Sequence, residues 1–106
     1  MSREEDIANV LIADNDPEVA RLMLEILARK GIRGHLVSDR DSALDFIGRG
    51  SCDLVFTGET IDLRSDRVSR REGGFDLLEK IGANWPELPV IMIADAARVG
   101  SHSQSR

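Results

Sequence analysis

The sequence predicts an α/β fold in which a parallel sheet carries helices on both faces, and three observations predict it. Short apolar runs alternate with segments of helical periodicity along the 106 residues. The first run is rich in β-branched residues and ends in the polar Asp14-Asn15-Asp16. A strong helix start follows, with Asp16 as N-cap and Pro17 as first helical residue. The order is βαβαβαβ, and right-handed crossovers make it a doubly wound sandwich.

The first strand and helix are predicted from residues 9–31. Asn9–Ala13 is a short apolar run typical of a buried strand. The helix begins at Pro17, and Arg29, Lys30 and Gly31 end it with two cations and a C-terminal glycine. Apolar residues recur between these ends at positions i, i+3, i+4, i+7 and i+8, namely Val19, Leu22, Met23, Ile26 and Leu27. This spacing predicts that all five face the core.

The second βα unit and the third strand are predicted in the next segment. Gly34–Ser38 is the second strand, and Asp39 or Asp41 caps a second helix that Gly48 and Gly50 end. The third strand is Asp53–Thr57.

The rest of the chain supplies a polar stretch, a helix and a strand. The polar stretch runs from Gly58 to Gly73, and a third helix begins near Phe75 and ends near Gly82. Val90-Ile91-Met92-Ile93-Ala94 is the fourth strand and the most apolar. We expect a single domain over residues 1–97 and a disordered tail over 98–106.

Composition narrows the functional classes. Lysine plus arginine number 14 and aspartate plus glutamate 19, so the net charge is −5, and an acidic chain is a poor general binder of nucleic acid. No apolar run can span a bilayer and no signal-peptide core is present, which predicts a cytoplasmic location without membrane contact. A lone Cys52 suits a reducing compartment, and one cysteine with two histidines is too few for structural zinc.

Ligands of doubly wound sheets bind at the carboxyl ends of the strands, so the candidate site lies there. The rule places three short segments around one crevice: Asp14-Asn15-Asp16, Thr57-Gly58-Glu59 and Ala94-Asp95. Clustered carboxylates indicate a divalent-cation site, whereas the simpler interpretation is that Asp16 caps the helix and Asp14 is solvated. For Asp16 we favour the cap, and for Asp14 both interpretations stand. Asp53 opens a strand and is expected to bond backbone amides.

Four arginines in the polar stretch form a second candidate: Arg64, Arg67, Arg70 and Arg71. Their spacing of three and four would align them on one side of a helical turn, where they could dock an acidic partner or a phosphate. The favoured alternative is a solvated loop.

Four pieces of the chain, in order, resemble the receiver domain of two-component response regulators. Val10–Pro17 resembles the family's first strand and acidic cluster, and Cys52–Thr57 its third strand. Gly73–Leu78 resembles its Asp-Gly-plus-helix segment, and Leu88–Ile93 its fourth strand. The resemblance implies a three-layer, flavodoxin-like (CheY-like) sandwich with strand order 2-1-3-4, lacking the family's fifth strand and final helix.

The chain departs from the family at the residues of phosphoryl transfer. The alignment puts Gly58 at the phosphoacceptor aspartate, Ala94 at the switch hydroxyl and Asn15 at a carboxylate that contacts Mg²⁺. The family's lysine has no counterpart, and Gly74 follows Gly58 by 16 positions, a longer spacing than the family's. Asp14, Asn15 and Asp16 would then form a relic acidic pocket that binds Mg²⁺ weakly or not at all, and no cofactor is required.

The resemblance with these departures predicts a pseudo-receiver that is not an enzyme and acts through protein contacts. A histidine kinase, another signalling protein or a second copy is the expected partner. Two contact surfaces are expected: the arginine-bearing loop from Glu59 to Gly73 and the edge strand Val90-Ile91-Met92-Ile93. An exposed apolar edge favours a homodimer. Two alternatives remain. One is a phosphorylatable regulator with a displaced acceptor, Glu59 or Asp62. The other is a fragment of a haloacid-dehalogenase-type phosphatase, whose Asp-x-Asp start Asp14-Asn15-Asp16 also resembles.

Overall fold

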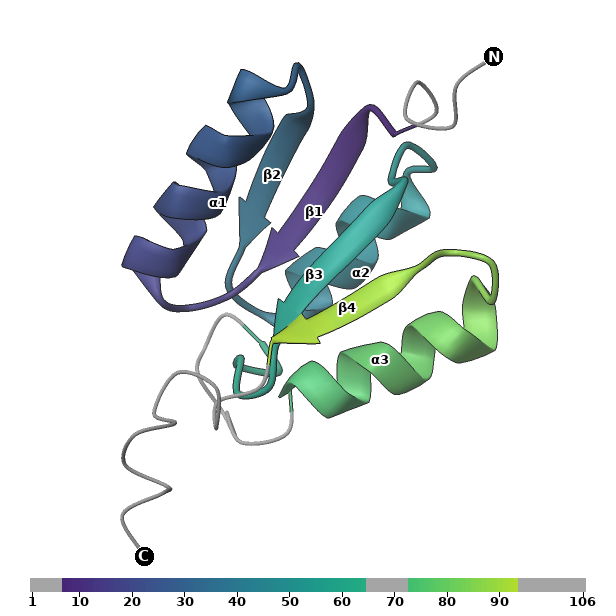
Figure 1. Cartoon of the computed structure of the whole chain (residues 1–106). Helices are drawn as coiled ribbons and strands as arrows, with labels where there is room; N and C mark the ends of the chain where they lie inside the picture. The colour runs from purple at the N-terminus through teal and green to yellow at the C-terminus, as the bar shows by residue number, and fades with distance from the viewer. Residues whose placement is uncertain (1–6, 65–72, 94–106) are drawn as a thin grey trace, which may run out of the picture.

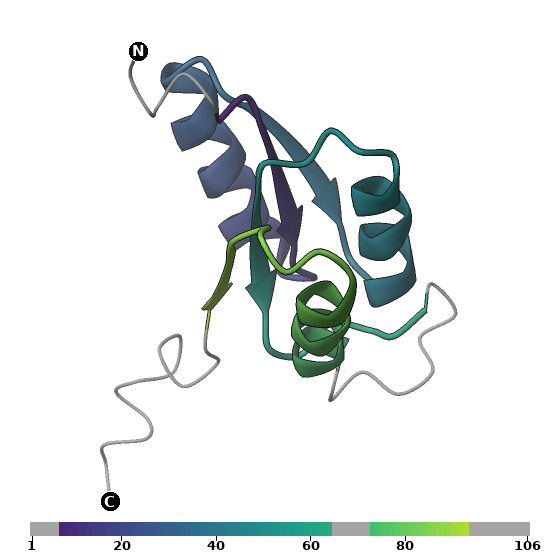
Figure 2. The same ribbon diagram turned by 90° about the vertical axis from the view of Figure 1, so that its right-hand side faces the viewer.

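The computed structural model describes residues 7–64 and 73–93, and within them it confirms a four-stranded parallel sheet in the order β2-β1-β3-β4. The elements alternate along the chain as predicted: β1 (Asn9–Ala13), α1 (Pro17–Arg29), β2 (Arg33–Val37), α2 (Arg40–Gly48), β3 (Leu54–Gly58), α3 (Gly73–Asn84) and β4 (Val90–Ile93). Helix α1 covers one face of the sheet, and α2 and α3 cover the other (Figures 1 and 2).

Helix α1 begins and ends where its sequence predicts. The carboxylate of Asp16 accepts from the backbone N–H of Glu18 and Val19, which satisfies two amides that have no partner inside the helix. At the other end Gly31 has a φ of 75°, a conformation that glycine adopts without strain. The helix packs closely on β2 because Gly34 has no side chain: a Cβ there would lie 2.6 Å from Cδ2 of Leu24.

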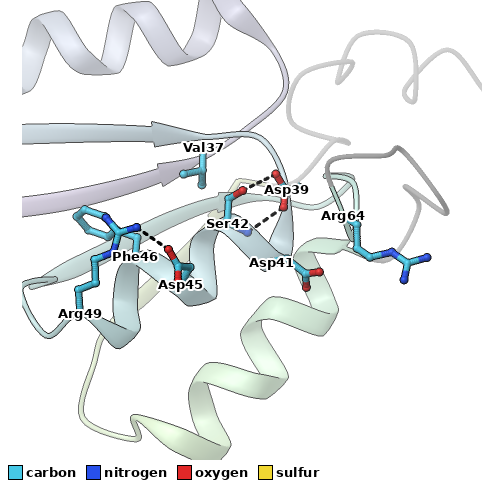
Figure 3. A pocket seen from close by; sticks show the side chains of 8 residues that line it. All are labelled: Val37, Asp39, Asp41, Ser42, Asp45, Phe46, Arg49 and Arg64. Carbon is cyan, nitrogen blue, oxygen red and sulfur yellow. Dashed lines mark hydrogen bonds and ion pairs between the residues drawn. The ribbon is translucent and has the colours of Figure 1, made fainter.

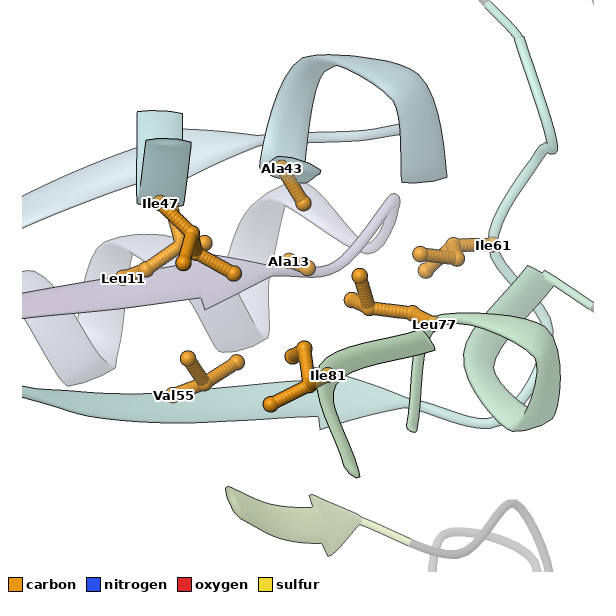
Figure 4. Close-up of a cluster of buried hydrophobic side chains, with 8 residues drawn as sticks. All are labelled: Leu11, Ala13, Ala43, Ile47, Val55, Ile61, Leu77 and Ile81. Carbon is orange, nitrogen blue, oxygen red and sulfur yellow. The ribbon is translucent and has the colours of Figure 1, made fainter. Parts of the chain in front are cut away.

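The core lies between the sheet and the α2–α3 layer (Figure 4). Its buried residues come from four elements and one loop: Leu11, Ala13, Ala43, Ile47, Val55, Ile61, Leu77 and Ile81. Strand β1 is buried along almost its whole length because β2 and β3 flank it and helices lie on both faces. This burial on both faces explains why the sequence of β1 is a continuous apolar run, as is typical of a central strand in a parallel sheet.

Three boundary predictions need correction. The second strand is Arg33–Val37 and the third is Leu54–Gly58, one residue earlier and one later than predicted. The third helix continues to Asn84, past Gly82. The pairing register explains the shifted ends of these two strands. Arg33 pairs with Asn9 of β1, so the second strand begins there, and Gly58 pairs with Ile93 of β4, so the third strand continues to it.

A further correction concerns the apolar pattern of α1. Leu22 and Ile26, predicted to face the core, are 60% and 47% exposed. The helix turns Ala20 toward the sheet instead, and Ala20 is fully buried. Periodicity gave α1 a broad apolar face, but the described residues cover only part of it.

Candidate functional site

The polar residues after β1 and the end of β3 lie together at the carboxyl edge of the sheet, as the strand-end rule predicts. Ala13 pairs with Thr57, so Asp14 follows β1 beside Gly58, the last residue of β3. Thr57 is fully buried, and its hydroxyl donates to the carbonyl oxygen of Gly58 at 3.0 Å. Gly58 is buried and offers no side chain to this edge.

Asp14 is buried rather than solvated, which corrects one of the two interpretations of this residue. Its side chain is 3% exposed, and Oδ1 accepts from the backbone N–H of Asp16 at 2.8 Å. A buried carboxylate is stabilised by such charge-assisted bonds. Asp16 is the N-cap of α1, which confirms the favoured interpretation.

Asn15 stands where the family alignment expects a second carboxylate. It is exposed, and its Nδ2 donates to the carbonyl oxygen of Thr60 at 3.1 Å, which ties the β1–α1 turn to the segment after β3. An amide contributes no charge to a cation site. In the described part of the chain no three His, Cys, Asp or Glu side chains are placed to hold a metal ion together.

The segment after β3 is anchored on α2, an arrangement that sequence analysis missed. Ile61 is fully buried in the core, and Asp62 forms a parallel bridge with Asp39. The backbone N–H groups of Arg40 and Asp41 donate to the carbonyl oxygens of Asp62 and Leu63 at 2.8 and 3.1 Å. Asp39 is also the N-cap of α2, so one buried residue serves both contacts.

Helix α3 approaches the same edge through two glycines. The backbone N–H of Gly74 donates to the carbonyl oxygen of Glu59 at 3.0 Å. A Cβ on Gly74 would overlap the carbonyl oxygen of Gly58, and one on Gly73 would overlap that of Ile61. Glycine is thus required where the first turn of α3 meets the end of β3.

A pocket of about 550 Å³ lies at the end of β2 beside α2 (Figure 3), and the carbonyl oxygen of its lining residue Val37 accepts from the backbone N–H of Asp14 at 3.0 Å. It is lined by Val37, Asp39, Asp41, Ser42, Asp45, Phe46, Arg49 and Arg64. Within it Arg49 is paired with Asp45 at 2.6 Å, and Asp39 bonds both the backbone N–H and the hydroxyl of Ser42. The lining mixes both signs of charge, so the pocket does not select an anion by charge alone.

Several predicted contact residues lie outside the described residues. Arg67, Arg70 and Arg71 are among them, and the predicted switch position Ala94 and the tail over 98–106 also lie outside the described residues. Arg64 is described and exposed. The edge strand Val90–Ile93 is the last strand in the described sheet, and Ile91 on it is 47% exposed.

One contact between helices was outside the reach of the sequence. Arg40 of α2 forms ion pairs with Asp41 and with Asp76 of α3, each at 2.6 Å. The hydrogen bonds to both carboxylates raise the pKa of Arg40 above its ordinary value, and the bond to Asp76 has the larger effect. Arg40 thereby joins α2 to α3.

The role predicted for Asp53 is confirmed, since its Oδ2 accepts from the backbone N–H groups of Ala8 and Asn9, each at 2.9 Å.

Comparison with known proteins gives concordant matches. The family model of the response regulator receiver domain matches residues 10–102. The nitrogen assimilation regulatory protein NtrX of Azorhizobium caulinodans is 33% identical over 86 residues, which cover 81% of this chain and 18% of that protein. The DNA-binding transcriptional regulator NtrC of Rhizobium meliloti is 31% identical over 87 residues, 82% of this chain and 16% of that protein. The chain thus spans less than a fifth of the length of these relatives.

Solved structures share the fold. NtrX from Brucella abortus, solved in complex with ADP, is 29% identical with a TM-score of 0.69, over 92% of this chain and 21% of that one. The response regulator TrrA from Thermotoga maritima, solved with Mg²⁺ and BeF, is 19% identical with a TM-score of 0.69, over 90% of this chain and 76% of that one. No helix in the described ranges is long and apolar enough to cross a membrane.

Proposed function

This chain belongs to the response regulator receiver domain family, and from that premise we propose that it is a pseudo-receiver, which signals in the cytoplasm without forming an aspartyl phosphate. The observation that carries the proposal is Gly58. This glycine ends β3 at the position that the family resemblance assigns to the phosphoacceptor, and it is buried beside the turn that holds Asp14. Phosphoryl transfer to the protein needs a nucleophile, and glycine supplies none.

The cation side of the site supports the same proposal. Receiver chemistry uses a divalent cation held by carboxylates, and here Asp14 is followed by the neutral Asn15. The Asn15 side chain already donates to Thr60, and Asp14 already accepts from Asp16. Fewer charged oxygen ligands lower the affinity for a hard cation, so we expect weak Mg²⁺ binding and no requirement for it.

Protein contacts are the output that remains for such a domain. A histidine kinase or another signalling protein is one partner class, and a second copy of the chain is the one we favour. Strand β4 is the edge of the described sheet and supports an association: its four residues, Val90–Ile93, carry no charge, and charged residues are a common protection of sheet edges. The net charge of −5 disfavours nucleic acid as a general partner.

The experiment is phosphorylation of the purified chain followed by intact-mass measurement. We expect no gain after incubation with phosphoramidate and Mg²⁺, under conditions in which a receiver domain that retains its aspartate gains one phosphoryl group. A gain would overturn the proposal. Fragmentation that mapped the group to Glu59 or Asp62 would favour the displaced-acceptor alternative instead.

Light scattering over a concentration range tests the homodimer separately. The expected result is a mass that rises from one chain toward two. A constant mass of one chain would restrict the proposal to foreign partners.

A further inference from the structure

The segment that follows β3, residues 59–63, is bonded to other parts of the chain through its backbone carbonyl oxygens. Four of these carbonyls accept hydrogen bonds from donors outside the segment: Glu59, Thr60, Asp62 and Leu63. Three of the donors are backbone N–H groups, those of Gly74, Arg40 and Asp41. The fourth is the side-chain amide of Asn15, whose Nδ2 lies 3.1 Å from the Thr60 oxygen. Of these four bonds, only the one from Asn15 is made by a side chain.

The partner of Asn15 decides which end of its amide faces the segment. A carbonyl oxygen can only accept a hydrogen bond, so the side chain must present its NH₂ group to Thr60 rather than Oδ1. A divalent cation such as Mg²⁺ binds oxygen ligands, whereas a hydrogen-bond donor points toward the segment here. Residue 15 therefore does not fit the role of a cation ligand in this arrangement.

An aspartate at position 15 could not make the bond that Asn15 makes. An ionised carboxylate has no proton to donate, so its oxygens would repel the Thr60 oxygen. It would also form a run of three carboxylates with Asp14, which is 3% exposed, and Asp16. The neutral amide avoids both costs. Asparagine is thus matched to this turn in a way that an ionised acid is not.

We propose that Asn15 is a strap that stands in the place of a cation. Its amide holds residues 59–63 against the β1–α1 turn, so that this edge of the sheet keeps one arrangement without a bound ion. The inference rests on the proposed function, because a domain that forms no aspartyl phosphate does not need the cation. The first residues of α2 and α3 are bonded to the same segment, so a protein partner meets them in the same arrangement with or without Mg²⁺.

Amide hydrogen exchange of the full chain tests the strap. The reporters are the three backbone N–H groups that donate to the segment, Arg40, Asp41 and Gly74, because they exchange when residues 59–63 detach. Asn15→Ala is expected to lower their protection by about fivefold, which is the effect of losing one net hydrogen bond. Reporters that keep their wild-type protection in Asn15→Ala would overturn the proposal.

Asn84→Ala is the matched control. Asn84 is also exposed, and its Nδ2 also donates to a backbone carbonyl, that of Lys80 at 2.9 Å, but this bond lies within α3. Its removal should leave the protection of the three reporters unchanged. Equal losses in Asn84→Ala and Asn15→Ala would show a general effect of losing an amide, which would also overturn the strap.

Asn15→Asp tests whether the amide stands in the place of a cation. With a chelator present, this variant should lose at least as much reporter protection as Asn15→Ala. Millimolar MgCl₂ should restore its protection, because a cation can then lie between the new carboxylate and the carbonyl oxygen. The wild type and Asn15→Ala should not respond to MgCl₂. Protection that rises with Mg²⁺ in the wild type, or that Mg²⁺ fails to restore in Asn15→Asp, would contradict the substitution of amide for cation.

Hydrogen exchange and intact mass separate the two proposals. An Asn15→Ala variant with wild-type protection removes the strap and leaves the pseudo-receiver proposal standing. A phosphoryl group on the wild type removes the pseudo-receiver proposal, while the three reporter amides still decide whether Asn15 holds the segment.

Discussion

Arg40 of α2 and Asp76 of α3 form an ion pair with Nη1 and Oδ2 2.6 Å apart, and it joins two helices that are 36 positions apart in sequence. The two side chains are only 20% and 29% exposed. Because Arg40 also pairs with Asp41, the guanidinium lies between two carboxylates.

Asp76→Asn should therefore lower the free energy of unfolding by about 1 kcal/mol, the upper part of the range for partly exposed pairs. The matched control is Asp45→Asn, which removes the Arg49 pair at the same 2.6 Å distance, where both side chains are about two-thirds exposed. Urea unfolding should show a near-zero effect for the control. Equal losses in both variants would mean that Arg40 does not join the helices.

Asp53 joins the start of β1 to the start of β3. Its Oδ2 accepts from two backbone amides, Ala8 and Asn9. Asp53→Ala should cost about 1.5–3 kcal/mol of unfolding free energy, since hydrogen bonds to a charged group are lost. Asp53→Asn keeps an acceptor oxygen and should recover part of this in the same urea titration. A loss with alanine below the error of the titration would contradict the role.

Two glycines of α3 should respond to alanine with opposite signs. Gly74→Ala is expected to destabilise the chain by about 1–3 kcal/mol, because the new Cβ overlaps the carbonyl oxygen of Gly58. Gly82 is exposed in the same helix with nothing within 4 Å of a Cβ, so Gly82→Ala should stabilise by about 0.5–1 kcal/mol. Thermal unfolding of both variants makes the comparison.

Placing a carboxylate at the end of β3 tests the proposal that the chain forms no aspartyl phosphate because Gly58 supplies no nucleophile. Gly58→Asp should gain the mass of one phosphoryl group from phosphoramidate with Mg²⁺, where the wild type gains none. Adding Asn15→Asp supplies a second acidic ligand and should tighten Mg²⁺ binding by about tenfold, measured by calorimetry. Gly58→Asn is the control without a nucleophile. If the single and double variants both stay unmodified in the folded state, features other than Gly58 and Asn15 block the reaction.

Cys52 makes the stability of the folded chain fall at alkaline pH. Burial raises the pKa of its thiol above the ordinary 9.0. The thiol is then neutral in the folded state over a pH range where the unfolded chain holds a thiolate, so stability is full below pH 9.0 and falls as the pH rises above it. Cys52→Ala should flatten this fall, measured by urea unfolding at pH 8 and pH 10. An unchanged slope would assign the fall to other groups.

The sequence predicted the elements well because their signals are local. Asp16 and Pro17 start α1 through bonds within three residues, and the apolar run Asn9–Ala13 is a strand on its own composition. Strand ends were less certain because register sets them. Asp53 was counted in the third strand, whereas its side chain clamps β1 and the strand begins at Leu54.

The site was only partly predictable, since it depends on contacts across the chain. The strand-end rule brought Asp14 and Gly58 together from topology alone. The Asp39–Asp62 bridge and the Arg40–Asp76 pair have no local pattern that announces them. The helical spacing predicted that Leu22 and Ile26 face the core, but in the structure both are exposed. A narrower count, in which Ala20, Leu24 and Leu27 face the sheet, would have left both exposed.

The central place of β1 has a consequence for biosynthesis. This strand is made before β2 and β3, yet it pairs on one side with β2 and on the other with β3, and Asp53 holds its first residue, Asn9. A nascent chain that has emerged only through α2 exposes one unpaired edge of its most buried strand. That intermediate is open to pairing with other chains until residues 53–58 leave the ribosome. Slow translation before Asp53 would therefore favour misassembly, whereas a pause after β3 would be harmless to β1.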